Sequence, residues 1–262
     1  MKIHGVPAMR FVISRFLWAT KLSSMFTIKT TSGNRLRFYP GPVSVALWCD
    51  PAFYERDYAV LEECLRPGDV FVDVGANVGA LSLKASAIVG SQGKVFAIEG
   101  HPKTVKHLRG NLDLNQTGNV SVFHSAVGDK KGIVHFTTQR CDDANHVVES
   151  GVAVPMFTLD SLLPDVPVRL LKIDIEGFEL FALRGAERVL CRTDFIYFEA
   201  YESYFGRYGC SASDVLSFLA EHGFDTALPP DHKALELENI LAVSRCETRK
   251  GSLNSVMPGL RI

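Results

Sequence analysis

A glycine-containing turn lies where a predicted strand passes into a predicted helix. The turn reads Asp73-Val-Gly-Ala-Asn-Val-Gly79, and its glycines let the backbone approach a ligand that a Cβ atom would exclude. The helix start beyond the turn offers free N–H groups to the same ligand. The spacing is G-x-x-x-G, whereas dinucleotide-binding turns have G-x-G-x-x-G, so we expect a ligand with a compact polar tail.

A carboxylate follows the next predicted strand. Glu99 lies 20 residues beyond Gly79, a position from which a carboxylate can accept hydrogen bonds from both hydroxyls of a ribose. A glycine turn or an acidic residue after a strand is common by itself. A glycine turn and an acidic residue at matching positions of consecutive βαβ units together indicate a nucleoside-binding site.

Strands and helices alternate along most of the chain. Apolar, β-branched runs predict strands at 70–73, 94–98, 120–123, 170–174 and 195–198, and a closing antiparallel strand at 237–243. Helical spacing predicts helices from Pro51 to about residue 66 and at 81–89, 102–115, 179–190 and 211–222. One or two extra strands and a loop are expected between residues 129 and 160. This alternation predicts a mainly parallel sheet.

The N-terminal segment differs in charge from the rest of the chain. Residues 1–49 contain seven basic residues and no Asp or Glu, although the formal net charge of the whole chain is −1. We expect a β-hairpin around the turn-rich Thr31–Asn34. This basic arm could dock on the more acidic body, or it could attract anionic lipid, nucleic acid or an acidic substrate. Its apolar stretch at Phe11–Trp18 is too short to span a membrane.

Composition and cysteine spacing indicate a globular protein without a cysteine-based metal site. Hydrophobic residues make up 47% and charged residues 22% of the chain, which is ordinary for a domain with a sizeable core. The six cysteines lie far apart in the sequence, without the close pairs of metal or redox motifs. We therefore expect free thiols and a cytoplasmic location.

Several blocks of the sequence match the motifs of one enzyme family. The blocks are Arg66–Asp69 with Val72–Gly79, Ala97–Glu99, Phe157–Asp160, Leu171-Lys-Ile-Asp-Ile-Glu-Gly177 with Glu179 and Leu183–Ala186, and Asn239–Val243. Together they resemble the FkbM-type family of class I S-adenosylmethionine-dependent methyltransferases, over about residues 55–244. Gly100 departs from the pattern, because the family usually has proline there.

The resemblance implies an α/β fold with a Rossmann-like, seven-stranded, mainly parallel sheet. The strand order would be 3-2-1-4-5-7-6, with helices on both faces. From the residues before this region we expect an N-terminal arm containing a helix and a β-hairpin. The chain is accordingly divided into the basic arm over 1–50, a methyltransferase domain over 51–246 and a polar tail over 247–262.

The resemblance also implies S-adenosyl-L-methionine as the cofactor, lying across the carboxyl ends of the strands. The residues that match the family's cofactor positions are Asp73, Gly75, Ala76, Asn77 and Gly79 for the methionine part, Glu99 for the ribose, Ser125 and Ala126 beside the adenine, and Gly100 and Asp174.

Three carboxylates end predicted strands near the expected position of the methyl group. Asp174 and Glu176 end the fourth strand of the implied sheet and Glu199 the fifth. One of them could accept the proton of a hydroxyl acceptor, which needs a base, whereas an amine or thiolate acceptor need not. They could instead bind a divalent cation, although we assign no metal. Purely structural roles are a further alternative, with Asp174 bonded to backbone amides and Glu176 shaping a helix start.

By analogy with the family, we expect methylation of a hydroxyl on a small molecule, a sugar or a secondary metabolite. An alternative acceptor is a protein, lipid or nucleic acid recruited by the basic arm, and another alternative is a cofactor-binding module without catalysis. We do not expect a nucleic-acid partner, peripheral membrane contact through the arm stays open, and the sequence gives no oligomeric state. An aromatic cluster could line the acceptor pocket or belong to the core: Tyr197, Phe198, Tyr201, Tyr204, Phe205 and Tyr208.

Overall fold

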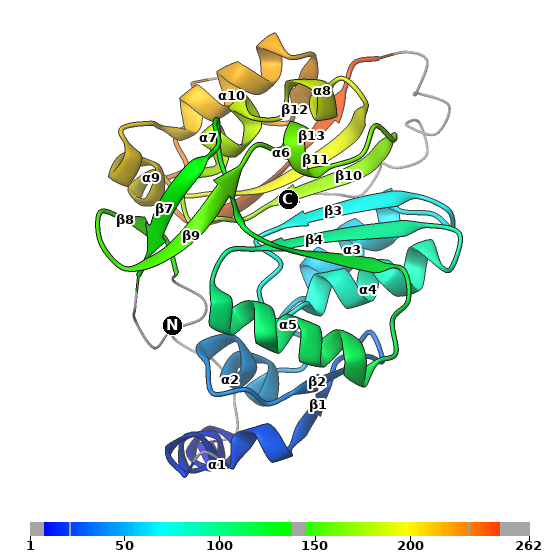
Figure 1. Ribbon diagram of the computed structural model, residues 1–262, viewed down its shortest axis with the longest axis vertical. Helices are drawn as coiled ribbons and strands as arrows, with labels where there is room; N and C mark the ends of the chain where they lie inside the picture. Colours follow the sequence, from blue (N-terminus) through cyan, green and yellow to red (C-terminus); the bar gives the residue numbers. More distant parts are fainter. Residues whose placement is uncertain (1–7, 21, 138–144, 230, 247–262) are drawn as a thin grey trace.

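A seven-stranded sheet forms the centre of the molecule (Figure 1). The computed structural model describes residues 8–20, 22–137, 145–229 and 231–246. The strands of this sheet are β3 (Val70–Val74), β4 (Lys94–Glu99), β5 (Val120–His124), β10 (Val168–Ile173), β11 (Thr193–Ala200), β12 (Phe224–Thr226) and β13 (Glu238–Ser244). Their order is β12-β13-β11-β10-β3-β4-β5, and β13 runs antiparallel to both of its neighbours while the other pairs are parallel. This is the order 3-2-1-4-5-7-6, so the predicted fold is confirmed.

Helices cover both faces of the sheet. One face carries α3 (Glu55–Cys64), α4 (Ala80–Val89) and α5 (Pro102–Leu114), and the other carries α6 (Leu159–Leu162), α7 (Glu179–Arg184), α8 (Glu187–Leu190) and α10 (Ala212–Glu221), with the short α9 (Glu202–Phe205) nearby. Neighbouring strand residues pack into different apolar clusters: Val72 and Leu171 belong to one cluster, Phe71 and Leu170 to another. Because successive side chains of a strand point to opposite faces of the sheet, each strand packs against the helices on both faces.

The central strands are apolar along almost their whole length because both of their faces are buried. Among the charged residues of these strands, Asp73, Glu99 and Lys172 are buried. Each lies near the carboxyl end of its strand. Charged groups are rarely buried without a partner, so these positions point to a polar site at this edge of the sheet.

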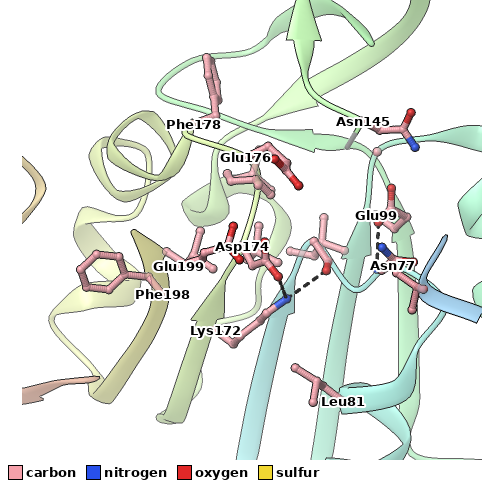
Figure 2. A pocket seen from close by; sticks show the side chains of 18 of the residues that line it. Asn77, Leu81, Glu99, Asn145, Lys172, Asp174, Glu176, Phe178, Phe198 and Glu199 are labelled. Atoms are coloured by element: carbon pink, nitrogen blue, oxygen red, sulfur yellow. Dashed lines mark hydrogen bonds and ion pairs between the residues drawn. The ribbon is translucent and has the colours of Figure 1, made fainter. Parts of the chain in front are cut away.

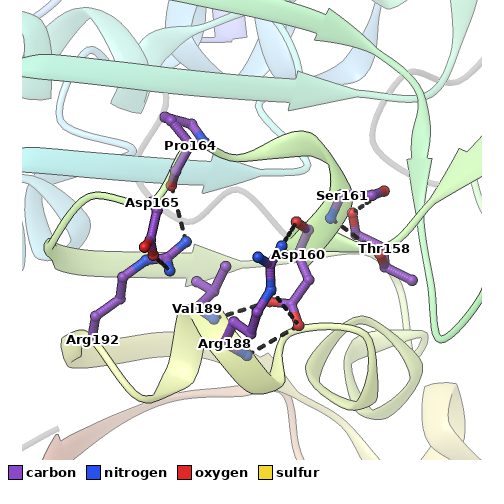
Figure 3. A network of polar contacts seen from close by, with 8 residues as sticks. All are labelled: Thr158, Asp160, Ser161, Pro164, Asp165, Arg188, Val189 and Arg192. Carbon is purple, nitrogen blue, oxygen red and sulfur yellow. Dashed lines mark hydrogen bonds and ion pairs between the residues drawn. The ribbon is translucent and has the colours of Figure 1, made fainter.

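The predicted helix over 179–190 is in fact two helices, because the helical conformation is interrupted at Gly185. A Cβ atom on Gly185 would be 2.1 Å from the carbonyl oxygen of a neighbouring loop, so the helix cannot continue through it with a side chain. The Asp160 carboxylate then caps α8, accepting from the N–H groups of Arg188 and Val189 at 3.0 Å each (Figure 3). The helix predicted from Pro51 likewise begins only at Glu55, after a turn.

A second, four-stranded sheet occupies the region where only one or two strands were expected. Its strands are β6 (Ala126–Val127), β7 (Gly132–Phe136), β8 (Val147–Val148) and β9 (Val152–Phe157), in the order β6-β9-β7-β8. β9 ends at Phe157, because Thr158 accepts a hydrogen bond from Ser161 N–H and caps α6. β6 and β8 are too short to leave an alternating pattern.

The N-terminal arm packs on the helices of the sheet. It contains α1 (Ala8–Ala19), the 3-10 helix η1 (Ser23–Met25), the hairpin of β1 (Thr27–Lys29) and β2 (Arg35–Arg37), and α2 (Pro42–Cys49). Leu36, Phe38 and Leu47 share one apolar cluster with Leu83 and Leu108 of α4 and α5. α2 was not predicted, because this helix is apolar on nearly all sides and lacks the usual helical period.

Other sequence predictions concern features outside the sheet. The polar tail over 247–262 and Cys141 lie outside the described residues. The five described cysteines are free thiols. Within the portions of the chain given above, no helix has the length and apolar character needed to cross a bilayer.

The arm is tied to α5 by a buried asparagine, which gives a stability prediction. Asn111 Oδ1 accepts from Arg37 N–H at 2.8 Å and its Nδ2 donates to Val78 O at 2.8 Å. Asn111→Ala leaves both groups unsatisfied, so we expect the free energy of unfolding to fall by about 2–4 kcal/mol, measured by urea denaturation. Asn115→Ala is the matched control: Asn115 also bonds the hairpin backbone but is only half-buried, and a loss below about 1 kcal/mol is expected. Equal losses would contradict this account.

Candidate active site

A cavity of about 300 Å³ lies at the carboxyl ends of the central strands (Figure 2). Nine of the predicted site residues line it: Gly75, Asn77, Glu99, Gly100, Ser125, Ala126, Asp174, Glu176 and Glu199. Segments distant in sequence complete its wall, among them α2, the start of α3 and the residues on either side of 138–144. The tertiary structure therefore brings together most of the site residues that the sequence motifs predicted.

Asp73, Ala76 and Gly79 lie behind the cavity wall. Asp73 is fully buried, and its Oδ2 accepts from Ser82 Oγ at 2.6 Å. Gly79 is the N-cap of α4, where a Cβ atom would be 2.6 Å from the Leu108 side chain. Each of these three has a packing or hydrogen-bonding role in the fold, and their direct contact with a ligand stays a prediction.

The glycine at position 75 is required by a close approach between β3 and β10. Its φ is +80°, and a Cβ atom there would be 1.9 Å from the carbonyl oxygen of Asp174. The N–H groups of Gly75 and Ala76 both donate to Ile98 O, at 2.9 and 3.0 Å. The turn after β3 is thus fixed against β4 and β10 and leaves its open side to the cavity.

Glu99 is held in place by two backbone donors. Its Oε2 accepts from Asn77 N–H at 2.9 Å and its Oε1 from His101 N–H at 2.8 Å. Burial raises the pKa of Glu99 to about 7, against the lowering effect of these two hydrogen bonds. Each carboxylate oxygen can accept a second hydrogen bond, so Glu99 can still bind a diol in the cavity.

Lys172 is a site residue that the sequence analysis did not single out. Its Nζ donates to Gly75 O at 3.1 Å and lies 3.2 Å from Asp174 Oδ2 (Figure 2). It also lies 3.4 Å from Asp73 Oδ1. Burial alone would lower the pKa of Lys172, but the carboxylates of Asp174 and Asp73 raise it above its ordinary value. A lysine within the otherwise apolar run from Leu170 to Ile173 was the signal that could have found it.

The three predicted catalytic carboxylates converge beside the end of β10 (Figure 2). Burial, followed by repulsion from Asp174 and Glu176, raises the pKa of Glu199 to about 9. Glu176 has a φ of +59°, in the left-handed region that L residues rarely adopt. The buried Glu179 supports this loop, because its Oε1 accepts from Ile175 N–H at 2.9 Å. Within the described parts of the chain, no three His, Cys, Asp or Glu side chains are grouped as metal ligands would be.

A second polar wall was not predicted and comes from three distant segments. Asp57 of α3 accepts at Oδ1 from Tyr197 Oη at 2.9 Å and from Asn239 Nδ2 at 3.5 Å. Burial raises the pKa of Asp57 above its ordinary value. All three residues line the cavity, as do Pro42 and Val43 of α2. Of the predicted aromatic cluster, Tyr197 and Phe198 line the cavity, whereas Phe205 is buried in the core.

The close approach at Gly75 gives a second stability prediction. Gly75→Ala should lower the free energy of unfolding by about 2–5 kcal/mol, because it combines an unfavourable φ with a backbone clash. Gly68→Ala is the matched control, with φ +93° and open space around the added Cβ atom, and should cost only about 1–2 kcal/mol. Thermal and urea denaturation measure both losses. A Gly75→Ala protein as stable as the control would show that this turn is not fixed by the contact.

Comparisons with known proteins agree with the geometry. The sequence model of the FkbM methyltransferase domain matches residues 73–226. The hexuronic acid methyltransferase AglP of Haloferax volcanii is 27% identical over 175 residues, which cover 64% of this chain and 68% of that protein. The crystal structure of methyltransferase FkbM from Methylobacillus flagellatus superimposes with a TM-score of 0.50 at 19% identity, covering 76% of this chain and 54% of that one. The structural match shows the shared fold.

The cavity fits S-adenosylmethionine, the cofactor of this family. The turn with Gly75 and Asn77 forms part of the cavity wall, and Glu99 presents a fixed carboxylate for a ribose. The Ser125 Oγ atom is buried at the cavity and has no hydrogen-bond partner among the described residues, as expected of a group that bonds to a ligand. The family model matches more than half of this chain. The chain therefore belongs to the FkbM family of S-adenosylmethionine-dependent methyltransferases.

Proposed function

We propose that this methyltransferase acts on a hydroxyl oxygen of a small molecule, and that the acceptor is an uncharged sugar or a similar polyol. The proposal is carried by the half-buried Glu199 carboxyl group, which faces the cavity beside Asp174 and Glu176 (Figure 2). A hydroxyl acceptor requires a base. Asp174, Glu176 and Glu199 are the carboxylates that the sequence motifs predicted for this role.

The residues proposed to hold the cofactor are those on the β3 and β4 side of the cavity. Gly75 and Asn77 would lie beside its methionine part, Glu99 would accept from the ribose hydroxyls, and Ser125 with Ala126 would border the adenine. Bound S-adenosylmethionine supplies a methyl group on a positively charged sulfur. Gly100 after β4 and Asp174 after β10 also line the cavity, and Asp73, Ala76 and Gly79 would fix the turn from behind.

Glu199 is the proposed general base. Its pKa is raised to about 9 by burial and by the neighbouring carboxylates, and a carboxylate of that pKa accepts a hydroxyl proton more readily than an ordinary one. Asp174 is already engaged by Lys172 Nζ at 3.2 Å, which suits it better to positioning. Glu176 completes the wall and raises the pKa of Glu199 through repulsion.

The charge of the cavity supports an uncharged acceptor. Five described carboxyl groups line it, those of Asp57, Glu99, Asp174, Glu176 and Glu199, against the single ammonium group of Lys172. An acceptor carboxylate would meet net repulsion among them. Tyr197 and Asn239, beside Asp57, offer polar groups for sugar hydroxyls. The name of the relative AglP, a hexuronic acid methyltransferase, supports a sugar as the acceptor class.

Methyl transfer from radiolabelled S-adenosylmethionine tests the acceptor class. We expect label on neutral hexosides, with a kcat/KM at least about tenfold above that of the matching hexuronides. A charge repulsion of only about 1.4 kcal/mol is enough for a tenfold ratio. Label on amines or thiols alone would overturn the oxygen acceptor. A preference for the hexuronides would overturn the uncharged acceptor and leave methyl transfer itself intact.

Glu199→Gln tests the proposed base. We expect kcat to fall by about 100- to 10,000-fold, while calorimetry shows affinity for S-adenosylhomocysteine unchanged within about threefold. Because Glu199 must be ionised to accept a proton, the wild-type rate should rise about tenfold per pH unit and level off near pH 9.

The exposed Glu236→Gln serves as the control and should keep the wild-type rate and pH profile. If Glu199→Gln retained kcat while Asp174→Asn lost it, Asp174 and not Glu199 would be the base.

A further inference from the structure

The arm carries most of the exposed large apolar side chains found in the described residues. Eight of the twelve lie between Met9 and Phe26, and the other four are scattered over the rest of the chain. Scattered single residues of this kind are ordinary on a protein surface, whereas a concentration on one element marks an interaction site.

Within α1 these side chains form one stripe. Met9, Val12, Ile13 and Phe16 follow the spacing i, i+3, i+4, i+7, and are exposed to 72%, 65%, 40% and 63%. Ser14 and Leu17 lie on another side of α1 and are buried, and Leu17 shares an apolar cluster with α2 residues. The stripe is therefore not needed to dock α1 on the protein.

Exposed positive charge is concentrated on the same arm as this stripe. Arg10 and Arg15 of α1 and Lys29, Arg35 and Arg37 of the adjoining hairpin are all exposed. None of these five forms an ion pair with a carboxylate in the described part of the chain, and residues 1–49 contain no acidic residue. An apolar stripe together with unpaired cations is complementary to an anionic lipid surface.

We infer that α1 and the β1-β2 hairpin form a docking surface for the anionic face of a membrane. α1 is too short to cross a bilayer, so the helix lies in the interface, with its apolar stripe among the acyl chains and the basic residues at the headgroups. In Figure 1 the arm occupies the end of the molecule opposite α10, where the rest of the fold leaves it accessible.

The docking surface is joined to the active site through α2. α2 packs on α1, and its Pro42, Val43 and Ala46 line the cavity. Membrane docking therefore places the wall of the active site next to the docked helix. This inference holds whichever acceptor the enzyme uses.

Vesicle co-sedimentation of the full chain tests the docking surface. We expect binding to vesicles of phosphatidylcholine with about 30 mol% phosphatidylserine, and much weaker binding to phosphatidylcholine alone. The double substitution Val12→Ser with Phe16→Ser should weaken binding at least about tenfold through lost apolar burial. Arg10→Gln and Arg15→Gln should each weaken it about fivefold, in a manner that high salt removes.

Ile133→Ser is the matched control, because Ile133 is 71% exposed and lies on β7, away from the arm. It should bind vesicles as the wild type does, and circular dichroism should show all variants folded. Failure of the wild-type chain to bind anionic vesicles would overturn the inference. So would the finding, by sedimentation velocity, that Val12→Ser with Phe16→Ser abolishes a dimer while vesicle binding is unchanged, because the stripe would then be a contact between two copies of the chain.

Discussion

The buried ammonium group of Lys172 joins the two strand ends on which the active site is built. It contacts the carboxylates of Asp73 and Asp174 and the carbonyl oxygen of Gly75. A buried charge is tolerated when it is paired and hydrogen-bonded, and here one cation satisfies groups on both β3 and β10. Without it, Asp73 and Asp174 would add unbalanced negative charge to a cavity that already holds several carboxyl groups.

That excess of negative charge has a chemical consequence. Lys172 lowers the pKa of Glu199, but burial and repulsion from Asp174 and Glu176 outweigh it, so this pKa rises. The negative electrostatic potential of these carboxylates is also favourable for a cofactor whose sulfur is positively charged. The local backbone is under strain as well: Glu176 and Gly177 both have positive φ, and a Cβ atom on Gly177 would lie 2.4 Å from Tyr204 O. Strain of this kind persists at sites where the surrounding structure fixes it.

The arm connects this chemistry to the outer surface. The hairpin is anchored through Asn111 and a shared apolar cluster, and α2 is part of the cavity wall. One side of α1 is used for this packing, and another side is apolar and exposed. α2 therefore contributes both to the apolar packing of the arm and to the wall of the cavity.

The sequence by itself determined the local features of this protein. Strand, glycine turn and carboxylate followed from residue types and short spacings, and the motif from Leu171 to Gly177 pointed to the family and hence to the strand order. Tertiary structure alone decided the pairings across long distances: Lys172 with Gly75, and Asp57 with Tyr197. It also decided the helix break at Gly185, the second sheet and the role of α2. The physical reason is that periodicity records which side of one element is buried, whereas close approach between distant segments depends on how the elements pack together.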